Sequence, residues 1–301
     1  MNHSLDNPFA PFDAALEIAL TSNIAAAVAE DVGSGDLTGL LVPAGERVRA
    51  RVLVRETAIL CGAPWFAGVM RKIDPELQID WRYAEGTMMR ADTEVCIIDG
   101  PARSLLTAER SALNFLQLLS GVATATSRYV AAVAGTGAAI LDTRKTLPGL
   151  RLAQKYAVRV GGGQNQRLAL YDGILIKENH IAAAGGVGAA VRAAQALNAG
   201  VTIQVEVETL AQLDEALAAG AVSVLLDNFS LDAMREAVRV TNRHAVLEAS
   251  GGINMDTVRA IAATGVDRIS IGSLTKDIRA TDYSLRIIGP APSSTVIGLA
   301  A

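Results

Sequence analysis

The sequence AAILDTRKTLPGLR, residues 138–151, changes from an apolar run to two adjacent cations. The apolar run ends at Leu141 and has the length of a short buried strand. Arg144 and Lys145 follow it, and Pro148-Gly149 then turns the chain into a segment with helical spacing of apolar residues. The two cations therefore lie at the carboxyl end of a predicted strand, where α/β proteins hold their ligand-binding groups.

The charge of this region differs from that of the whole chain. The 301-residue sequence has a formal net charge of −4, whereas residues 142–180 contain seven Lys or Arg against three Asp or Glu. A local basic cluster suits an anionic small molecule, and the acidic whole argues against a nucleic-acid partner. Lys155 and Arg159, four residues apart on the predicted helix, are interpreted as a solvated face. Lys177 and the cation pair after Leu141 instead adjoin strand ends.

Composition favours a soluble α/β protein of a reducing compartment. Half of the residues are hydrophobic and few are aromatic, so small aliphatic side chains must fill packed layers. Cys61 and Cys96 have no metal-ligand spacing and are expected to be buried thiols. No basic region followed by an apolar one marks a signal peptide, so a cytoplasmic location is predicted. The uncharged run 111–127 is predicted to be a buried helix, not a membrane span.

The first third of the chain is predicted to form a small α+β layer. Its clearest element is the strand 47–55, in which Arg and apolar residues alternate and the arginines face solvent. The other expected elements are a loose arm over residues 1–12, a helix over 13–30 capped by Asp13, strands near 77–83 and 93–98, and a long helix opened by residues 109–117.

Beyond that helix, short apolar strands alternate with amphipathic helices. This rhythm implies parallel strands with right-handed crossovers, and the number of units favours a barrel over an open sheet, although spacing alone fits both. The strands are expected near 138–141, 173–176, 201–207, 222–226, 245–249 and 268–271, and the helices over 150–160, 187–198, 209–219, 231–241 and 255–264.

Polar or Gly residues follow every one of these strands, so they would converge on one rim of a barrel. The rim residues are Asp142 to Lys145, Lys177 to His180, Glu206, Glu208, Asp227, Asn228, Ser250 to Gly252, Gly272 and Ser273. This convergence is the strongest indication of an active site in the sequence.

The rim combines three kinds of group. Its cations can bind carboxylates or phosphates, and Glu206 with Asp227 can hold Mg²⁺ together with substrate phosphate oxygens. The Gly turns at 250–252 and 272–273 can offer backbone N–H groups to a phosphate. Together they predict a Mg²⁺-bound diphosphate, a separate monophosphate and a second anionic substrate. The alternative for Glu206 and for Glu208, on the same strand face, is an ion pair with a rim cation.

Nucleophilic catalysis is not expected. His180 is the only histidine predicted on the rim, and it is interpreted as a hydrogen-bonded structural residue, because no Ser/His/Asp or Cys/His constellation is in reach. His244 precedes a strand at the opposite end. Gly161-Gly162-Gly163 has no preceding strand and is not a dinucleotide fingerprint.

A series of motifs spread over nearly the whole chain matches one known family. The motifs are Glu109 to Phe115, Ser120 to Thr124, Asp142 to Arg151, Lys155 to Val158, Gly161 to Gly163, Leu175 to His180, Glu206 to Glu208, Leu226 to Asn228, Ser250 to Gly252 and Gly272 to Thr275. Through them the chain closely resembles the quinolinate phosphoribosyltransferases, and Asp142 to Thr146 is the most specific segment.

The resemblance implies an α/β fold of two domains. An N-terminal α/β sandwich domain, residues 1–115, is rejoined by the tail, 276–301. An incomplete seven-stranded parallel α/β barrel occupies residues 116–275. The resemblance also implies a homodimer, open to further assembly, in which the sandwich domain of one subunit covers the barrel of the other.

The implied activity is that of a pentosyltransferase. Quinolinate and phosphoribosyl pyrophosphate give nicotinate mononucleotide, pyrophosphate and CO₂, with Mg²⁺, in de novo NAD biosynthesis. One alternative is a paralogue that acts on another aromatic acid. Another is a catalytically silent ligand-binding homologue, against which the retained rim residues argue.

The resemblance also assigns roles to matching positions. The implied substrate-binding residues are Arg110, Thr143, Arg144, Lys145, Gln166, Arg167, Lys177, Glu206, Asp227, Ser250, Gly251, Gly252, Ile271, Gly272 and Ser273. Among them, Lys145, Glu206 and Asp227 are the implied catalytic residues, and the two carboxylates are also the implied Mg²⁺ ligands. By the same resemblance, Arg144, Arg167 and Lys177 would bind the quinolinate carboxylates, and Arg110 would come from the neighbouring subunit. Lys145 serves the diphosphate, and the turns 250–252 and 271–273 hold the 5′-phosphate.

Gln166 departs from the family pattern, which usually has Asn-His-Arg where this chain has Asn165-Gln166-Arg167. Gln can donate a hydrogen bond but carries no positive charge, so weaker dicarboxylate binding is predicted. An unchanged quinolinate KM in Gln166→His would reject this. Asp277 is a second position where histidine is common, and no effect is assigned to it.

Overall fold

A computed structural model describes residues 14–292 of the chain. It divides into two compact units, Met1–Thr124 with Arg279–Ala301, and Ala125–Ile278. The expected bounds, 1–115 with 276–301 and 116–275, stay a prediction, and they divide the chain within the same long helix as the observed units. The expected arm and the Asp13 cap lie outside the described residues.

The N-terminal unit contains a four-stranded antiparallel sheet in the order β12-β1-β5-β3. The strands are β1 (Arg47–Val54), β3 (Gln78–Trp81), β5 (Thr93–Pro101) and β12 (Tyr283–Pro290), and β2 (Ala58–Ile59) pairs separately with β4 (Met88–Met89). In β1 the buried residues Val48, Ala50, Val52 and Val54 alternate with exposed or half-buried ones, most of them arginines, which confirms the half-exposed strand. One of these arginines, Arg49, forms two hydrogen bonds with Asp99 on β5.

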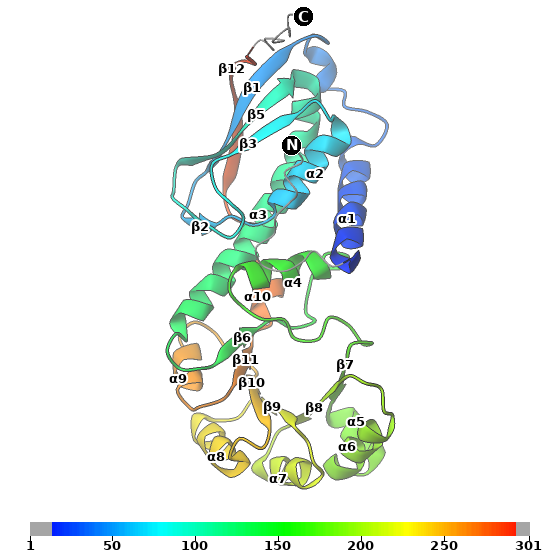
Figure 1. The fold of residues 1–301 in the computed structure, drawn as a ribbon, viewed down its shortest axis with the longest axis vertical. Coiled ribbons are helices and arrows are strands. Elements are labelled where there is room, and N and C mark those ends of the chain that lie inside the picture. The colour runs from blue at the N-terminus through cyan, green and yellow to red at the C-terminus, as the bar shows by residue number, and fades with distance from the viewer. Residues whose placement is uncertain (1–13, 293–301) are drawn as a thin grey trace, which may run out of the picture. The chain divides into compact units, whose positions relative to one another are not determined.

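Helices cover one face of this sheet (Figure 1). They are α1 (Ala14–Val32), α2 (Ala63–Ile73) and the first part of α3 (Ala102–Ala132), and a short 3-10 turn spans Gly39–Leu41. Phe66 on α2 meets Trp81 on β3 edge to face, with ring centroids 5.5 Å apart. Helix α3 confirms the buried helix over 111–127, but its start was expected near Glu109. The buried residues Leu105 and Ala108 continue the helical spacing toward the N-terminus, so the helix begins at Ala102.

The C-terminal unit contains a six-stranded parallel sheet in the order β6-β11-β10-β9-β8-β7. Its strands are β6 (Ala139–Leu141), β7 (Gly173–Ile176), β8 (Thr202–Val207), β9 (Ser223–Asp227), β10 (Val246–Ser250) and β11 (Arg268–Ser270). All six lie within a residue or two of the positions predicted from the sequence. The pairing of β6 with β11 curls the sheet as in an incomplete barrel.

Helices cover the outer side of this curved sheet (Figure 1). They are α4 (Arg151–Val160), α5 (Glu178–Ala184), α6 (Val187–Ala196), α7 (Leu210–Ala218), α8 (Leu231–Thr241), α9 (Val258–Ala262) and α10 (Ser273–Lys276). The short helices α5 and α10 were not predicted. No helix within residues 14–292 is long and apolar enough to cross a membrane.

The barrel has six strands in the described residues, one fewer than the seven that the resemblance implies. The position of a further strand is taken by a single parallel bridge between Leu141 and Gln164. The pairing does not continue as a strand, because the Gln166 N–H donates to the Asp142 carboxylate and not to a neighbouring backbone carbonyl. Across the gap between β6 and β7, the Arg167 guanidinium donates to the Gly173 carbonyl at 3.0 Å.

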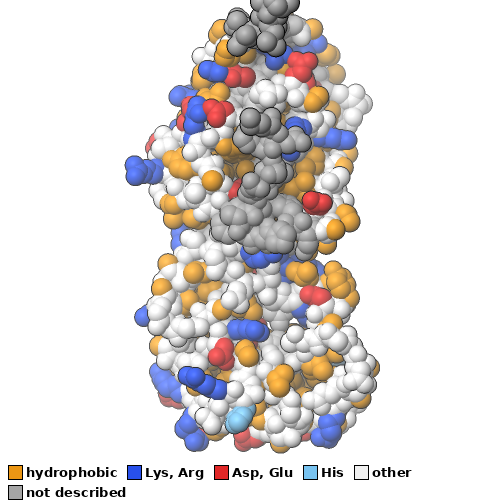
Figure 2. Space-filling model, in the orientation of Figure 1, with side chains coloured by type: hydrophobic (Ala, Val, Ile, Leu, Met, Phe, Trp, Pro, Cys, Tyr) orange, Lys and Arg blue, Asp and Glu red, His pale blue; other side chains and the backbone are white. Residues whose placement is uncertain are grey.

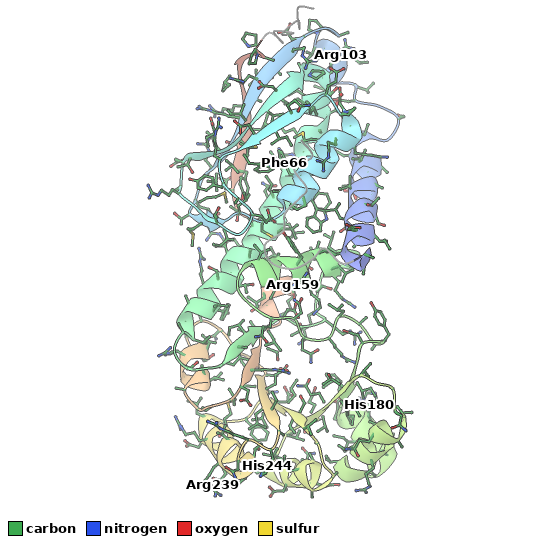
Figure 3. All side chains as sticks on the ribbon, in the orientation of Figure 1. Phe66, Arg103, Arg159, His180, Arg239 and His244 are labelled. Atoms are coloured by element: carbon green, nitrogen blue, oxygen red, sulfur yellow. The ribbon has the colours of Figure 1, made fainter. Side chains whose placement is uncertain are left out.

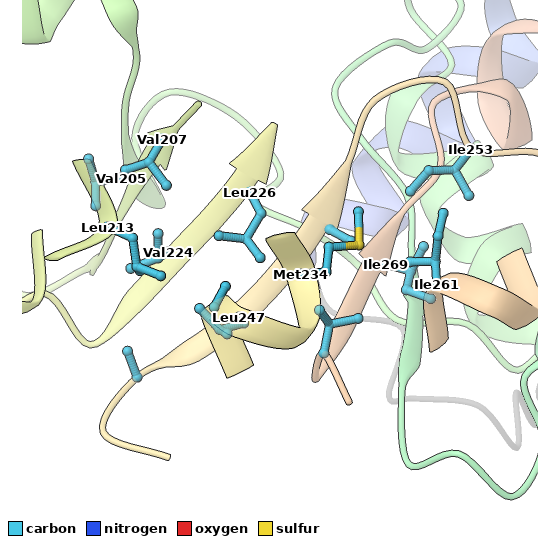
Figure 4. Close-up of a cluster of buried hydrophobic side chains, with 14 of the residues drawn as sticks. Val205, Val207, Leu213, Val224, Leu226, Met234, Leu247, Ile253, Ile261 and Ile269 are labelled. Carbon is cyan, nitrogen blue, oxygen red and sulfur yellow. The ribbon is translucent and has the colours of Figure 1, made fainter. Parts of the chain in front are cut away.

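Strand residues alternate between two environments in this unit. Outward-facing residues such as Val205, Leu226 and Ile269 pack with helix residues such as Leu213 and Met234 in the main apolar core (Figure 4). The inward-facing residues are largely polar and line a cavity of about 260 Å³. The two-residue period of a strand therefore separates an apolar outer layer from a polar interior.

Candidate active site

The carboxyl ends of the parallel strands carry the predicted rim residues. Arg144 and Lys145 follow β6, Lys177 follows β7, Glu206 lies near the end of β8, and Asp227 ends β9. Ser250 ends β10, and Gly272 lies between β11 and α10. Parallel strands have their carboxyl ends on the same edge, so these groups share one rim, as the sequence predicted.

The loop after β6 is held against the turn after β11. The Lys145 backbone N–H donates to Thr143 Oγ1 at 3.1 Å, and the Lys145 carbonyl accepts a hydrogen bond from Thr275. A Cβ at Gly272 would lie 3.1 Å from Lys145 Cδ. Glycine thus lets the lysine side chain lie over this turn, which brings a cation and a Gly turn together.

The turn after β10 packs against the end of β9. Gly251 has a φ of +101°, and a Cβ there would lie 2.1 Å from Asn228 Oδ1, so only glycine fits. The Asn228 N–H donates to the Ser250 carbonyl. Ile271 does not join this polar group, because its side chain packs in the outer core and its N–H donates to Leu141. The turn after β11 is therefore left with Gly272 and Ser273 as its phosphate-facing candidates.

An ion pair joins two of the predicted site residues. Lys177 Nζ lies 3.1 Å from Glu206 Oε2, and the Lys177 side chain remains nearly half exposed. The cation pairing that the sequence left open for Glu206 is therefore present. Glu208 lies beyond the end of β8 and is exposed, with its N–H donating to Gln212.

The two described histidines lie at opposite ends of the strands (Figure 3). His180 is on α5, after the carboxyl end of β7, and its Nδ1 accepts a hydrogen bond from the Lys177 N–H at 3.0 Å. His244 precedes the amino end of β10. The structural interpretation of His180 is confirmed, because it caps the helix next to the rim.

A buried ion pair lies next to the loop that follows β6. Lys155 Nζ donates to Asp142 Oδ1 at 2.5 Å, and both side chains are almost completely buried. The prediction that Lys155 lies on a solvated helix face was wrong. Its Nζ also donates a hydrogen bond to the Gln166 carbonyl. Asn165 Nδ2 donates to the other carboxylate oxygen of Asp142, Oδ2. Burial raises the pKa of Asp142 and lowers that of Lys155, because it disfavours both charges.

This network fixes the segment that carries Arg167. Burial, and then the positive charge of Arg144, lower the pKa of the Arg167 guanidinium. The charge of Arg144 therefore reaches the Arg167 guanidinium, and Arg144 Nε is buried without a hydrogen-bond partner among the described residues. Such a pair is suited to a ligand with adjacent carboxylates.

Gln166 faces the barrel interior. Its Nε2 donates to Gln204 Oε1 at 2.8 Å, and its Oε1 accepts from the Arg167 N–H at 2.7 Å. Its amide is thus largely engaged by protein groups. The predicted effect on dicarboxylate binding stays a prediction. Asp277 is exposed and lies 3.3 Å from Lys276.

Two carboxylates suit a cation shared with a substrate. Glu206 on β8 is aligned with Leu225 on β9. Asp227 lies two residues after Leu225, so it is on the same inner face of the sheet as Glu206. No group of three or more His, Cys, Asp or Glu among residues 14–292 could hold a metal ion by itself. A pair of carboxylates fits Mg²⁺ that takes its other ligands from substrate phosphates and water.

The remaining predicted residue, Arg110, is exposed on α3 in the N-terminal unit. Figure 2 shows Lys and Arg side chains interspersed with Asp and Glu on the visible face of each unit. That face has no continuous basic surface of the kind that binds nucleic acid.

Both units match one family of known proteins. Residues 36–120 match the description "Quinolinate phosphoribosyl transferase, N-terminal domain", and residues 122–286 match its C-terminal domain. The chain belongs to the quinolinate phosphoribosyltransferase family. The resemblance inferred from the motifs is therefore confirmed.

Curated relatives within the quinolinate phosphoribosyltransferase family are similar over most of their length. The nicotinate-nucleotide pyrophosphorylase (carboxylating) of Mycobacterium leprae is 41% identical over 281 residues, which are 91% of this chain and 97% of the relative. The probable enzyme of the same name from Bacillus subtilis is 40% identical over 259 residues, 86% of this chain and 90% of the relative. Enzyme class and family function are confirmed at this level.

A solved structure supports the fold. The nicotinate-nucleotide pyrophosphorylase from Francisella tularensis aligns with a TM-score of 0.88 and 44% identity, covering 90% of this chain and 96% of that one. The predicted fold class, a sandwich domain with an incomplete α/β barrel, is confirmed.

Sequence reasoning missed two polar residues inside the barrel of this family member. Gln204 Nε2 donates to Glu248 Oε2 at 2.9 Å, and both side chains are buried. A signal was available, because Gln204 precedes Glu206 by two positions and Glu248 precedes Ser250 by two. Each therefore shares a strand face with a rim residue. The Asp142–Lys155 pair gave no comparable signal.

Proposed function

We propose that this chain forms nicotinate mononucleotide, pyrophosphate and CO₂ from quinolinate and phosphoribosyl pyrophosphate. The observation that carries the proposal is the set of cations after the strands: Arg144 and Lys145 follow β6 next to the Gly turn at 272, and Lys177 follows β7. The charge of Arg144 also reaches Arg167, whose pKa it lowers. One cluster suits a dicarboxylate, and the other suits phosphates. The names of the curated relatives support this choice of reaction.

The dicarboxylate site would use Arg144, Arg167 and Lys177. Guanidinium groups bind carboxylates through paired N–H donors, and Lys177 adds a point charge. Arg167 already donates one N–H to the Gly173 carbonyl, which orients its guanidinium while leaving other donors available. Quinolinate carries two adjacent carboxylates, so it matches a cluster of this kind better than nicotinate does.

The phosphate sites would use Lys145, Gly272 and Ser273 on one side and the turn 250–252 on the other. Glu206 and Asp227 would hold Mg²⁺ with substrate oxygens. The chemistry that Mg²⁺ supplies when bound is neutralisation of charge on the pyrophosphate group. Lys145 would add to this neutralisation from the loop after β6.

The reaction itself requires no protein nucleophile. The bond between C1′ and the pyrophosphate oxygen breaks, and its electron pair leaves with pyrophosphate. The pyridine nitrogen of quinolinate then forms the new bond to C1′. The resulting pyridinium accepts the electron pair released when the adjacent carboxylate leaves as CO₂, and a proton replaces that carboxylate on the ring carbon. Glu206 or Asp227 would stabilise the positive charge on the ribose, and the arginines would orient the ring.

We also propose a homodimer whose site takes Arg110 from the partner. Arg110 is exposed on its own chain. Leu37, Leu41 and Tyr171 expose most of their large apolar side chains, 82%, 83% and 77% respectively. Exposed apolar side chains of this size are typical of surfaces that a second subunit covers. A cytoplasmic location stays a prediction.

The decisive experiment supplies quinolinate, phosphoribosyl pyrophosphate and Mg²⁺, and follows CO₂ and nicotinate mononucleotide. Nicotinate serves as the parallel substrate. With quinolinate, CO₂ and nucleotide are expected in equal amounts, and with nicotinate no nucleotide is expected. Turnover of a different acid would favour a paralogue, and binding of both ligands without turnover would favour a silent homologue.

A further inference from the structure

We propose that Glu248 and Gln204 are positioning residues for the quinolinate site, an inference that rests on the function proposed above. They continue as a hydrogen-bonded chain through Gln166 to the backbone of Arg167. Neither Glu248 nor Gln204 needs to touch a substrate in this role. Their effect would be to hold the Arg167 backbone, and with it the guanidinium, in a fixed position.

The chain has one consistent set of donors and acceptors. Glu248 Oε2 accepts from Gln204 Nε2 at 2.9 Å, which leaves Gln204 Oε1 to accept from Gln166 Nε2 at 2.8 Å. Gln166 Oε1 then accepts from the Arg167 N–H at 2.7 Å. Each link fixes the orientation of the next amide, because an amide nitrogen only donates and an amide oxygen only accepts. A carboxyl group retains an acceptor oxygen in either protonation state, so the direction of the chain does not depend on ionisation.

These side chains have room to move unless hydrogen bonds hold them. Gln204 and Glu248 are 5% and 1% exposed, yet both line the interior cavity of about 260 Å³. In a close-packed core, side chains are held by their neighbours, whereas next to a cavity part of that contact is absent. Hydrogen bonding is therefore the main restraint on these polar groups.

The hydrogen-bonded chain holds the main chain at Arg167, one residue after the position that the buried ion pair holds. Asp142 accepts from the Gln166 N–H, and Lys155 donates to the Gln166 carbonyl, so these groups hold the main chain of Gln166 itself. The Arg167 N–H has the Gln166 side chain as its acceptor. Loss of that acceptor would allow the Arg167 backbone to shift while the fold stays anchored.

Quinolinate binding should respond to such a shift more than phosphoribosyl pyrophosphate binding. Two adjacent carboxylates require cations at a fixed separation, and Arg167 contributes one of them. The residues proposed to bind phosphate lie on other loops, at Lys145 and in the turns 250–252 and 272–273. A change confined to the interior chain should therefore raise the quinolinate KM selectively.

The test compares three variants that alter the same cavity. Glu248→Leu removes the acceptor, and quinolinate KM should rise about threefold to tenfold, the range for one net hydrogen bond. The KM for phosphoribosyl pyrophosphate and kcat should stay within about twofold. Glu248→Gln keeps an acceptor oxygen and should restore the quinolinate KM. Ser223→Ala is the matched control, because Ser223 Oγ lines the cavity without a hydrogen-bond partner in the described residues.

A double-mutant cycle separates positioning from general loosening of the fold. Gln166→Ala breaks the chain at its other end, so Glu248→Leu should add little to the quinolinate KM in that background. Additive effects, or an unchanged quinolinate KM in Glu248→Leu, would overturn the proposal. If Glu248→Leu does not fold, Gln204→Met breaks the same chain with a side chain of similar length. Lack of wild-type turnover would reject the proposed function, whereas wild-type turnover with unaffected variants would reject only the positioning role.

Discussion

Lys177 Nζ lies 3.1 Å from Glu206 Oε2, so a cation proposed for the dicarboxylate is paired with a carboxylate proposed for the ribose and Mg²⁺. The Glu206 side chain is only 12% exposed, while that of Lys177 is 45% exposed. The lysine therefore has the freedom to exchange one anionic partner for another. Binding of quinolinate would draw Lys177 away and leave Glu206 available for the second substrate.

Glu206→Gln should lower kcat with little effect on quinolinate binding. Loss of one preorganised charge at a reacting centre costs roughly 100-fold in rate. Because Lys177 would lose its competing partner, the quinolinate Kd should stay the same or fall, as measured by calorimetry. Glu208→Gln is the control, two residues further on and exposed, and it should keep wild-type kcat. Equal effects of the two substitutions would refute the assignment.

Lys177→Met should raise the quinolinate KM about tenfold, because it removes a charged hydrogen-bond donor from the dicarboxylate site. The KM for phosphoribosyl pyrophosphate should change much less. Initial rates at varied concentrations of each substrate measure both constants. A larger effect on the phosphoribosyl pyrophosphate KM would place Lys177 in the other sub-site.

Lys155→Met should destabilise the protein by about 3–5 kcal/mol, because it leaves the Asp142 carboxylate buried without its cation. Asp142→Asn in the same chain should recover part of that loss. Chemical denaturation gives both values. Arg235→Met removes the exposed Arg235–Asp232 pair of α8 and should cost about 1 kcal/mol or less. Comparable losses at the buried and exposed pairs would contradict the role given to Lys155.

Glu248→Gln should raise Tm at neutral pH. Burial raises the pKa of Glu248, so the folded state holds its proton more strongly than the unfolded chain does. The favourable contribution of the protonated form is complete below the unfolded value and is lost as pH rises through the raised pKa. The gain from Gln should therefore be largest near pH 7 and should shrink as pH falls toward 4.5, the ordinary pKa of a glutamic acid. Thermal melts across this range measure it, and a constant difference would argue against ionisation of Glu248.

Gln166→His should lower the quinolinate KM, because an imidazolium would add positive charge next to Arg167. Gln204 Oε1, which now accepts from Gln166 Nε2, could accept from the imidazole N–H. An imidazolium cannot accept from the Arg167 N–H as Gln166 Oε1 does, so the prediction requires the added charge to outweigh the loss of that hydrogen bond. The effect should be greater below pH 6.5, where free histidine is charged. Quinolinate KM values for both forms at pH 6 and pH 8 test this, and equal values at both pH settings would reject the prediction made from the sequence.

Strand positions and the rim could be predicted from the sequence because both follow local patterns. Apolar runs of strand length, each followed by a charge or Gly, mark the carboxyl ends of parallel strands. The environment of Lys155 could not be predicted, since its partner Asp142 lies on another element and a lone lysine on a helix is usually solvated. Gln204 and Glu248 carried a usable signal in their two-residue spacing from Glu206 and Ser250. That signal shows which face they share, but not that they bond to each other.

The pairing of β12 with β1 has a consequence for synthesis of the chain. Val54 is aligned with Tyr283 in the sheet, so the N-terminal sheet lacks its edge strand until β12, residues 283–290, has left the ribosome. The barrel unit is continuous from Ala125 to Ile278 and is complete earlier. Contacts between residues so distant in sequence form slowly, and a sheet with an unpaired edge can pair with other chains. During translation the sheet that contains β1 is thus completed only after the barrel unit, and the edge of β1 is exposed to misassembly in the interval.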